Sequence, residues 1–150
     1  MTGHPFSELS ILRWSMLIGL LGILTGSSCS LFLYLLDLAT ETRQSHPFLL
    51  FFLPAAGAFS GWLYDRWGTA VSGGNRVVLD EIANPSSRGV LFRMAPLVLV
   101  GTLMTHLFGG SAGREGTAVQ MGGGFAGWLG KLFCGASGET RKQLLICGIA

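Results

Sequence analysis

Long stretches without a charged side chain are the feature that most limits how this chain can fold. Trp14–Leu36 has 23 uncharged residues, Pro47–Tyr64 has 18 and Met94–Gly113 has 20. A helix needs about 20 mainly apolar residues to cross the hydrocarbon core of a bilayer. Only 12% of the residues are charged, about half the share of an ordinary soluble domain. The sequence therefore predicts an all-α integral membrane protein.

The segments between these stretches predict how the helices are connected. Residues 37–46 read as a polar loop, and Pro54 should kink the second membrane helix because proline breaks the helical hydrogen-bond ladder. Asn75 is predicted to be the N-cap of a short helix through Ile82. Gly116–Gly130 has only 15 uncharged residues, which is short for a full span. A last apolar helix should begin near Gln143.

Glycine is frequent, at 23 of 150 residues, and its spacing indicates how helices pack. Gly22 and Gly26 are four residues apart in the first membrane stretch, a spacing that lets two helices approach closely. We therefore expect this face of the first helix to carry a helix contact.

Charge and cysteine content exclude several classes of function. The formal net charge of +2 is too small to indicate nucleic-acid binding. The three cysteines are Cys29, Cys134 and Cys147, an odd number without a CxxC spacing, which argues against a disulfide framework or a zinc site. We predict no metal, no cofactor and no catalytic residue.

Two glycine-rich turns each precede a predicted short helix, in "SGGNRVVLDEI" and "GGSAGREGTAVQMGG". The first amides of a helix lack intrahelical partners and lie at the positive end of the helix dipole. Within a membrane, such broken helices are tolerated where their ends line a cavity, and transporters bind ions there. The sequence thus predicts an anion site shared by two helix N-termini.

Glu115 follows Arg114 at the start of the second of these helices. A carboxylate at a helix N-terminus is stabilised by the dipole and occupies the place that an external anion would take. Protonation would release it, so proton and anion would compete for one location. The alternative is that Glu115 marks a helix end at the membrane surface, paired with Arg114.

A rival interpretation is an intramembrane serine hydrolase. Residues 109–113 fit the G-x-S-x-G pattern around Ser111, and His106 lies five residues before that serine. The pattern requires a strand before the serine, whereas the preceding residues here read as a membrane helix. His106 is better explained as a packing or hydrogen-bonding residue and Ser111 as part of a turn.

The stretch "GGSAGREGTAVQMGG" resembles the G-[KR]-E-G-P-x-V-Q-x-G-G signature of the CLC family of anion channels and proton-coupled exchangers, with Thr117 in place of the usual proline. The resemblance implies that Glu115 is the gating, proton-coupling glutamate. It also implies that anion-binding positions lie at two helix starts. These positions are Gly73, Gly74 and Asn75 in the first turn and Gly113, Arg114, Gly116 and Thr117 in the second.

The first turn departs from the common family pattern. Many members have G-S-G-I-P, but this chain reads Ser72-Gly73-Gly74-Asn75-Arg76, so Gly73 falls where the ion-coordinating serine usually lies. "GNRVVLDEI" and "THLFGGSAGREGTAVQMGG" are instead similar to the bacterial fluoride-exporting branch. This resemblance implies fluoride/proton antiport; the alternative is a chloride channel or chloride/proton exchanger.

The family resemblance also implies an architecture and partners. We expect residues 1–150 to be the N-terminal portion of one inverted-repeat transmembrane domain with broken, tilted helices. The protein would be a homodimer when full length, in the lipid bilayer of the bacterial inner membrane, and would carry a small anion and protons. An inert, truncated membrane fragment is the alternative from a different class.

Overall fold

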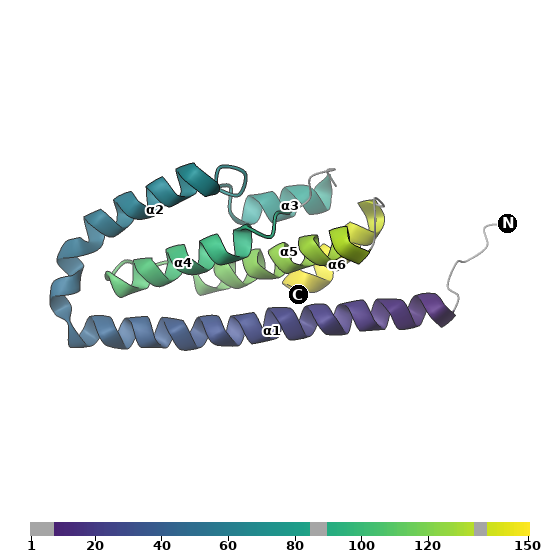
Figure 1. Cartoon of the computed structure of the whole chain (residues 1–150), viewed down its shortest axis with the longest axis horizontal. Helices are drawn as coiled ribbons and strands as arrows, with labels where there is room; N and C mark the ends of the chain where they lie inside the picture. Colours follow the sequence, from purple (N-terminus) through teal and green to yellow (C-terminus); the bar gives the residue numbers. More distant parts are fainter. Residues whose placement is uncertain (1–7, 85–89, 134–137) are drawn as a thin grey trace.

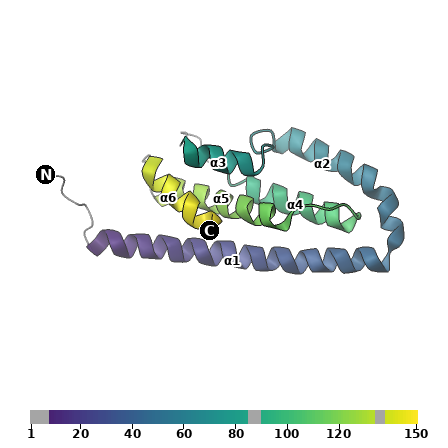
Figure 2. The same cartoon turned by 180° about the vertical axis from the view of Figure 1, so that it is seen from behind.

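The computed structural model describes the backbone of residues 8–84, 90–133 and 138–150. Every element in these ranges is helical, which confirms the predicted fold class. The elements in chain order are α1 (Glu8–Ser45), the 3-10 helix η1 (Pro47–Phe52), α2 (Leu53–Trp67), α3 (Asn75–Ala83), α4 (Met94–Leu107), α5 (Arg114–Phe133) and α6 (Gly138–Ile149). They form three layers, with α1 on one side, α4, α5 and α6 in the middle, and α2 and α3 on the other side (Figures 1 and 2).

The first helix is longer than predicted, because residues 37–45 continue α1 instead of forming a polar loop. This segment has no glycine or proline before Pro47 to end the helix. Its hydroxyl groups also bond back to the helix: Thr40 Oγ1 donates to the Leu36 carbonyl at 2.8 Å and Thr42 Oγ1 to the Leu38 carbonyl at 2.7 Å. The loop prediction was therefore wrong.

The second apolar stretch contains a break instead of a kinked helix. Residues Pro47–Phe52 form η1, and α2 begins at Leu53. Pro54 lies in the first turn of α2, where its missing N–H has no intrahelical acceptor to lose. The proline therefore sets a helix boundary and does not distort the interior of a helix.

Three other boundaries also differ from the sequence prediction. Helix α4 ends at Leu107, six residues before the end of the uncharged stretch. Helix α5 has 20 residues, a length of about 30 Å, so it is longer than the short helix that the 15 uncharged residues Gly116–Gly130 indicated. Helix α6 begins at Gly138, ahead of Gln143.

Helix α5 is the centre of the bundle, where it packs against α1, α3, α4 and α6. Its glycines permit these contacts. A Cβ added at Gly122 would overlap the Gly148 carbonyl of α6, and one added at Gly127 would overlap the Val90 carbonyl. On other faces, a Cβ at Gly123 would lie 3.0 Å from Val78 of α3, and one at Gly124 would lie 3.3 Å from Ala95 of α4. The glycines of α5 thus let α3, α4, α6 and the segment at Val90 come close to the α5 backbone.

The glycines of α1 behave differently. A Cβ added at Gly19, Gly22 or Gly26 would meet no atom within 4 Å. The helix contact predicted for Gly22 and Gly26 is therefore absent from the described part of the chain. Helix α1 instead contacts its neighbours through side chains such as Phe32 and Leu36, which are buried beside Val98 and Met121.

Two helical segments among the described residues are long and apolar enough to cross a membrane, Leu12–Ser45 and Pro47–Trp67. Met94–Leu107 is a shorter apolar helix. Only 11% of the most apolar window of each long segment is buried within the chain. Their apolar side chains therefore face outward, as those of membrane helices in contact with lipid do.

Candidate functional site

The turn between α4 and α5 is built by glycines that end α4. Gly109 has φ +88°, which glycine adopts without strain. Its N–H donates to the His106 carbonyl at 3.1 Å, and the Gly110 N–H donates to the Thr105 carbonyl at 2.8 Å. This pair of bonds is a Schellman motif, which satisfies the last carbonyls of a helix. Gly109 and Gly110 therefore end α4, and the chain can then begin α5.

Helix α5 begins at Arg114 directly after this turn. Gly113, Arg114 and Glu115 are all exposed, and Glu115 lies in the first turn of the helix. The first amides of α5 have no acceptor within the helix. The predicted gating carboxylate thus lies at an open, positively polarised helix start.

The start of α3 lies against the start of α5. Gly74 precedes α3 with φ +59° and ψ −133°, and a Cβ added there would lie 3.6 Å from the Gln120 side chain of α5. Asn75 Nδ2 lies 3.4 Å from the position that a Cβ of Gly116 would occupy. The two glycine motifs, 40 residues apart in the sequence, therefore meet.

One hydrogen bond joins the two helix starts. Gln120 Nε2 donates to Asn75 Oδ1 at 2.9 Å. Because this bond uses the Asn75 oxygen, the Asn75 amino group is the part of the side chain left to donate elsewhere. Gln120 was not among the predicted site residues. The sequence motif could have indicated Gln120, because this residue lies four positions after Gly116 and so lies on the same face of α5 as Gly116.

Asn75 does not have the role that the sequence indicated for its side chain. The N-cap of α3 is Gly74, and no side chain caps this helix start. Asn75 is the first residue of the helix, and its side chain bonds across to α5 instead. The N-cap prediction was wrong by one residue, because glycine at position 74 can adopt the positive φ that the turn requires.

Thr117 lies on the face of α5 that packs on α4. Its side chain is 2% exposed, and its Oγ1 donates to the Gly113 carbonyl at 3.1 Å and lies 2.9 Å from Thr102 Oγ1. The threonine that replaces the usual proline thus holds α5 to α4. Its hydroxyl proton is used by the Gly113 carbonyl, so anion contact at Thr117 would have to come from another group.

Gly73 lies at the edge of this arrangement. It is exposed, and the neighbours of a Cβ added there belong to Val77 on the following turn of α3. The structure thus brings Gly74, Asn75 and Gly116 together and leaves Gly73 outside their contact.

The residues of the rival hydrolase pattern have other partners. His106 Nδ1 lies 2.9 Å from the Thr102 carbonyl, one turn earlier in α4. Ser111 is exposed in the turn after the Schellman motif. The element before this serine is helix α4 and not a strand, so the geometry of a nucleophile elbow is absent here.

The described residues form an all-helical bundle, and two of its apolar segments face outward. The starts of α3 and α5, each preceded by glycines, meet in this bundle. These features define a class of membrane protein with broken helices. A family model described as voltage gated chloride channel matches residues 56–150. The chain therefore belongs to the voltage gated chloride channel (CLC) family, and its homologues are integral membrane proteins.

Two relatives narrow the branch of the family. The chain is 46% identical over 140 residues to a chloride/fluoride channel protein of Pseudomonas syringae pv. tomato, which covers 93% of this chain and 30% of the relative. It is 33% identical to a protein of known crystal structure, a CLC-type fluoride/proton antiporter, with a TM-score of 0.86 over 97% of this chain and 36% of the other. The resemblance to the fluoride branch is thus confirmed. The chain spans about a third of the length of both relatives.

Proposed function

We propose that this chain forms one side of the anion path of a fluoride/proton antiporter. The observation that carries the proposal is the contact between the starts of α3 and α5, joined by the Gln120–Asn75 hydrogen bond of 2.9 Å. The names of the two relatives, a chloride/fluoride channel protein and a fluoride/proton antiporter, support fluoride as the substrate.

In this proposal, the anion binds between α5 and α3. The first amides of α5 donate to it from one side, and the Asn75 amino group donates from the other. Fluoride is small and strongly hydrated, so a site that replaces its water must offer several N–H donors at once. Gly113 and Gly116 have no side chain that would cover the amides, and Gly74 allows α3 to approach.

Glu115 is the proposed gate, because its carboxylate can occupy the same amides when no anion is bound. A carboxylate is held there by the helix dipole and by charge-assisted hydrogen bonds. A proton on Glu115 removes the negative charge, weakens its hold and frees the amides for the anion. One proton site and one anion site then compete, which couples the two movements. Arg114 adds positive charge beside the start of α5.

We further propose that the protein works as a homodimer in the bacterial inner membrane and has no enzymatic activity, as the family resemblance implies. The pairing of Arg114 and Glu115 at a plain helix end is the competing explanation of this site. That explanation predicts no link between Glu115 and the transported anion.

The test is a flux measurement on the protein reconstituted in liposomes. Fluoride efflux is followed with a fluoride electrode and proton uptake with a pH electrode in the same experiment. We expect fluoride to leave the liposomes faster than chloride does. We also expect protons to enter the liposomes as fluoride leaves. Equal or faster chloride movement would contradict fluoride selectivity, and fluoride movement without protons would contradict antiport.

A further inference from the structure

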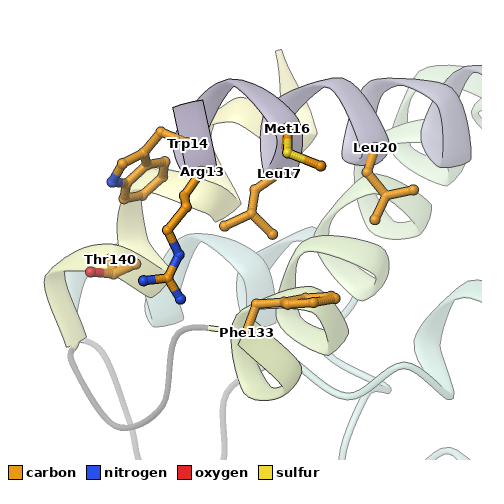
Figure 3. A pocket seen from close by; sticks show the side chains of 7 residues that line it. All are labelled: Arg13, Trp14, Met16, Leu17, Leu20, Phe133 and Thr140. Carbon is orange, nitrogen blue, oxygen red and sulfur yellow. The ribbon is translucent and has the colours of Figure 1, made fainter. Parts of the chain in front are cut away.

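A second candidate site lies at the opposite end of α1 from the α4–α5 turn. A cavity of about 640 Å³ opens between the first turns of α1, the end of α5 and the start of α6. Figure 3 shows its lining side chains, which come from these three helices. The cavity contains none of the residues assigned to the anion path, so it requires a separate explanation.

The guanidinium and hydroxyl groups of this cavity's lining come from Arg13 and Thr140. The Arg13 side chain extends from α1 into the space between Thr140 of α6 and Phe133 of α5 (Figure 3). Arg13 is exposed among the described residues. A guanidinium group offers five N–H donors in a planar fork, a geometry that matches the oxygens of a phosphate.

The rest of the lining is apolar. Met16, Leu17 and Leu20 follow Arg13 along α1, and Phe133 faces them from α5. Met16 is 76% exposed and Phe133 52% exposed, so the chain leaves much of this apolar lining open. The cavity is thus charged at one end and apolar along the direction in which α1 enters the membrane.

The sequence of α1 indicates the depth of the cavity in the bilayer. Arg13 is the last charged residue before the 23 uncharged residues Trp14–Leu36, so it marks the boundary between head groups and hydrocarbon. Trp14 also lines the cavity, and tryptophan is enriched at this boundary. The cavity is therefore placed so that its polar end reaches the head groups and its apolar end reaches the acyl chains.

The local charge favours an anionic ligand. Arg13 is the charged residue among those that line the cavity, and in the sequence residues 8–13 and 131–142 together hold four basic and two acidic residues. The same charge distribution places this end on the cytoplasmic side by the positive-inside rule, where anionic lipids are concentrated.

We infer that this cavity binds an anionic phospholipid, whose phosphate contacts Arg13 and whose acyl chain lies along Leu17, Leu20 and Phe133. Basic pockets between membrane helices bind anionic head groups in this way. The inference depends on the membrane setting of the chain and not on the proposed transport of fluoride.

The test uses the protein in nanodiscs that contain equal amounts of phosphatidylglycerol and phosphatidylcholine. Lipids that remain bound after mild detergent extraction are counted by native mass spectrometry. We expect the wild-type protein to retain phosphatidylglycerol over phosphatidylcholine by about fivefold, the factor for one basic side chain at an anionic surface. Arg13→Gln should reduce the ratio to about one, while Arg13→Lys should keep part of it.

Arg66→Gln is the matched control, because Arg66 is an exposed arginine in the last turn of α2 and does not line the cavity. It should leave the retention ratio unchanged. Equal retention of the two lipids by the wild-type protein would overturn the inference, as would an equal loss in Arg13→Gln and Arg66→Gln. Displacement of the lipid by soluble glycerol phosphate would also overturn it, since the site would then bind a free phosphate and not a lipid.

Discussion

The starts of α3 and α5 both follow glycine-rich turns, yet they are built differently. In α3, which has nine residues, the amides of Arg76 and Val77 bond back to the carbonyls of Gly73 and Gly74 at 3.3 and 3.1 Å. Helix α5 has 20 residues and carries the acidic Glu115 in its first turn, whereas the first turn of α3 has no acidic residue.

This difference assigns a separate contribution to each helix. The amides of α3 are partly used by the turn itself, so in the proposed site this helix would contribute mainly the Asn75 side chain. The start of α5 would contribute backbone amides, the helix dipole and the Glu115 carboxylate, which we propose competes with the anion for these amides. Gln120 connects the two contributions, since it belongs to α5 and holds the side chain from α3.

The largest effect should follow from replacing the amino group that Asn75 of α3 offers to the anion with a negative charge. Asn75→Asp keeps the size of the side chain and an oxygen that can accept the hydrogen bond from Gln120, but it places a negative charge beside the anion. We expect the apparent affinity for fluoride to fall by at least about tenfold, measured as the concentration dependence of fluoride flux. Asn84→Asp is the matched control at the opposite end of α3 and should have little effect. Equal effects of the two variants would exclude Asn75 from the anion path.

Removing the link between the two helices should have a smaller effect. Gln120→Met keeps the length of the side chain but cannot donate to Asn75 Oδ1. The loss of one hydrogen bond corresponds to about 0.5–1.5 kcal/mol, so we expect fluoride affinity to fall by about twofold to thirteenfold. A double-mutant cycle with Asn75→Ala should show coupling between the two positions. Additive effects would mean that Gln120 does not position Asn75.

Gly116→Ala separates function from stability. The added Cβ would lie 3.4 Å from Asn75 Nδ2, and alanine favours a helix over glycine by about 0.5–1 kcal/mol. We therefore expect unchanged or slightly higher thermal stability together with a fluoride flux that is reduced by about twofold to fivefold through crowding of the site. Loss of stability and flux together would indicate that Gly116 is needed for packing alone.

The smallest effect should come from Gly73→Ser. The new Cβ would meet Val77 Cγ2 at 2.9 Å, and Val77 can move the end of its side chain. Because Gly73 lies outside the contact between the two helices, we expect the fluoride-to-chloride flux ratio to change by less than about threefold, towards chloride. A larger shift would show that this turn contacts the anion directly. The turn before α3 would then contribute to the anion site, as the start of α5 is proposed to do.

The sequence predicted the elements with the clearest physical signals. Uncharged stretches located α1, α2 and α4, and the glycine motifs located the starts of α3 and α5. The glycine motifs also predicted that these two starts share one site, but the contacts that join them could not be derived from spacing, since they depend on how Val78, Ala95 and Gly148 pack against the glycine-rich faces of α5. Gln120 was missed for the same reason, because its partner is 45 residues away.

The wrong predictions share a different cause. Composition alone cannot distinguish a polar loop from a polar helix, so residues 37–45 were read as a loop although their hydroxyl groups bond back to the helix. The spacing of Gly22 and Gly26 is typical of a packed helix pair, but within the described residues α1 packs through Phe32 and Leu36, so the contact predicted for these glycines stays a prediction.

The central claim is that Glu115 and the anion compete for the start of α5. It is tested most directly by recording fluoride efflux and proton uptake together from liposomes that contain Glu115→Gln, with Glu41→Gln on the exposed face of α1 as the control. Glutamine at position 115 cannot take up a proton in this cycle, so we predict that proton uptake falls to the background of empty liposomes while the control remains coupled. Proton uptake at the wild-type ratio in Glu115→Gln would contradict the claim.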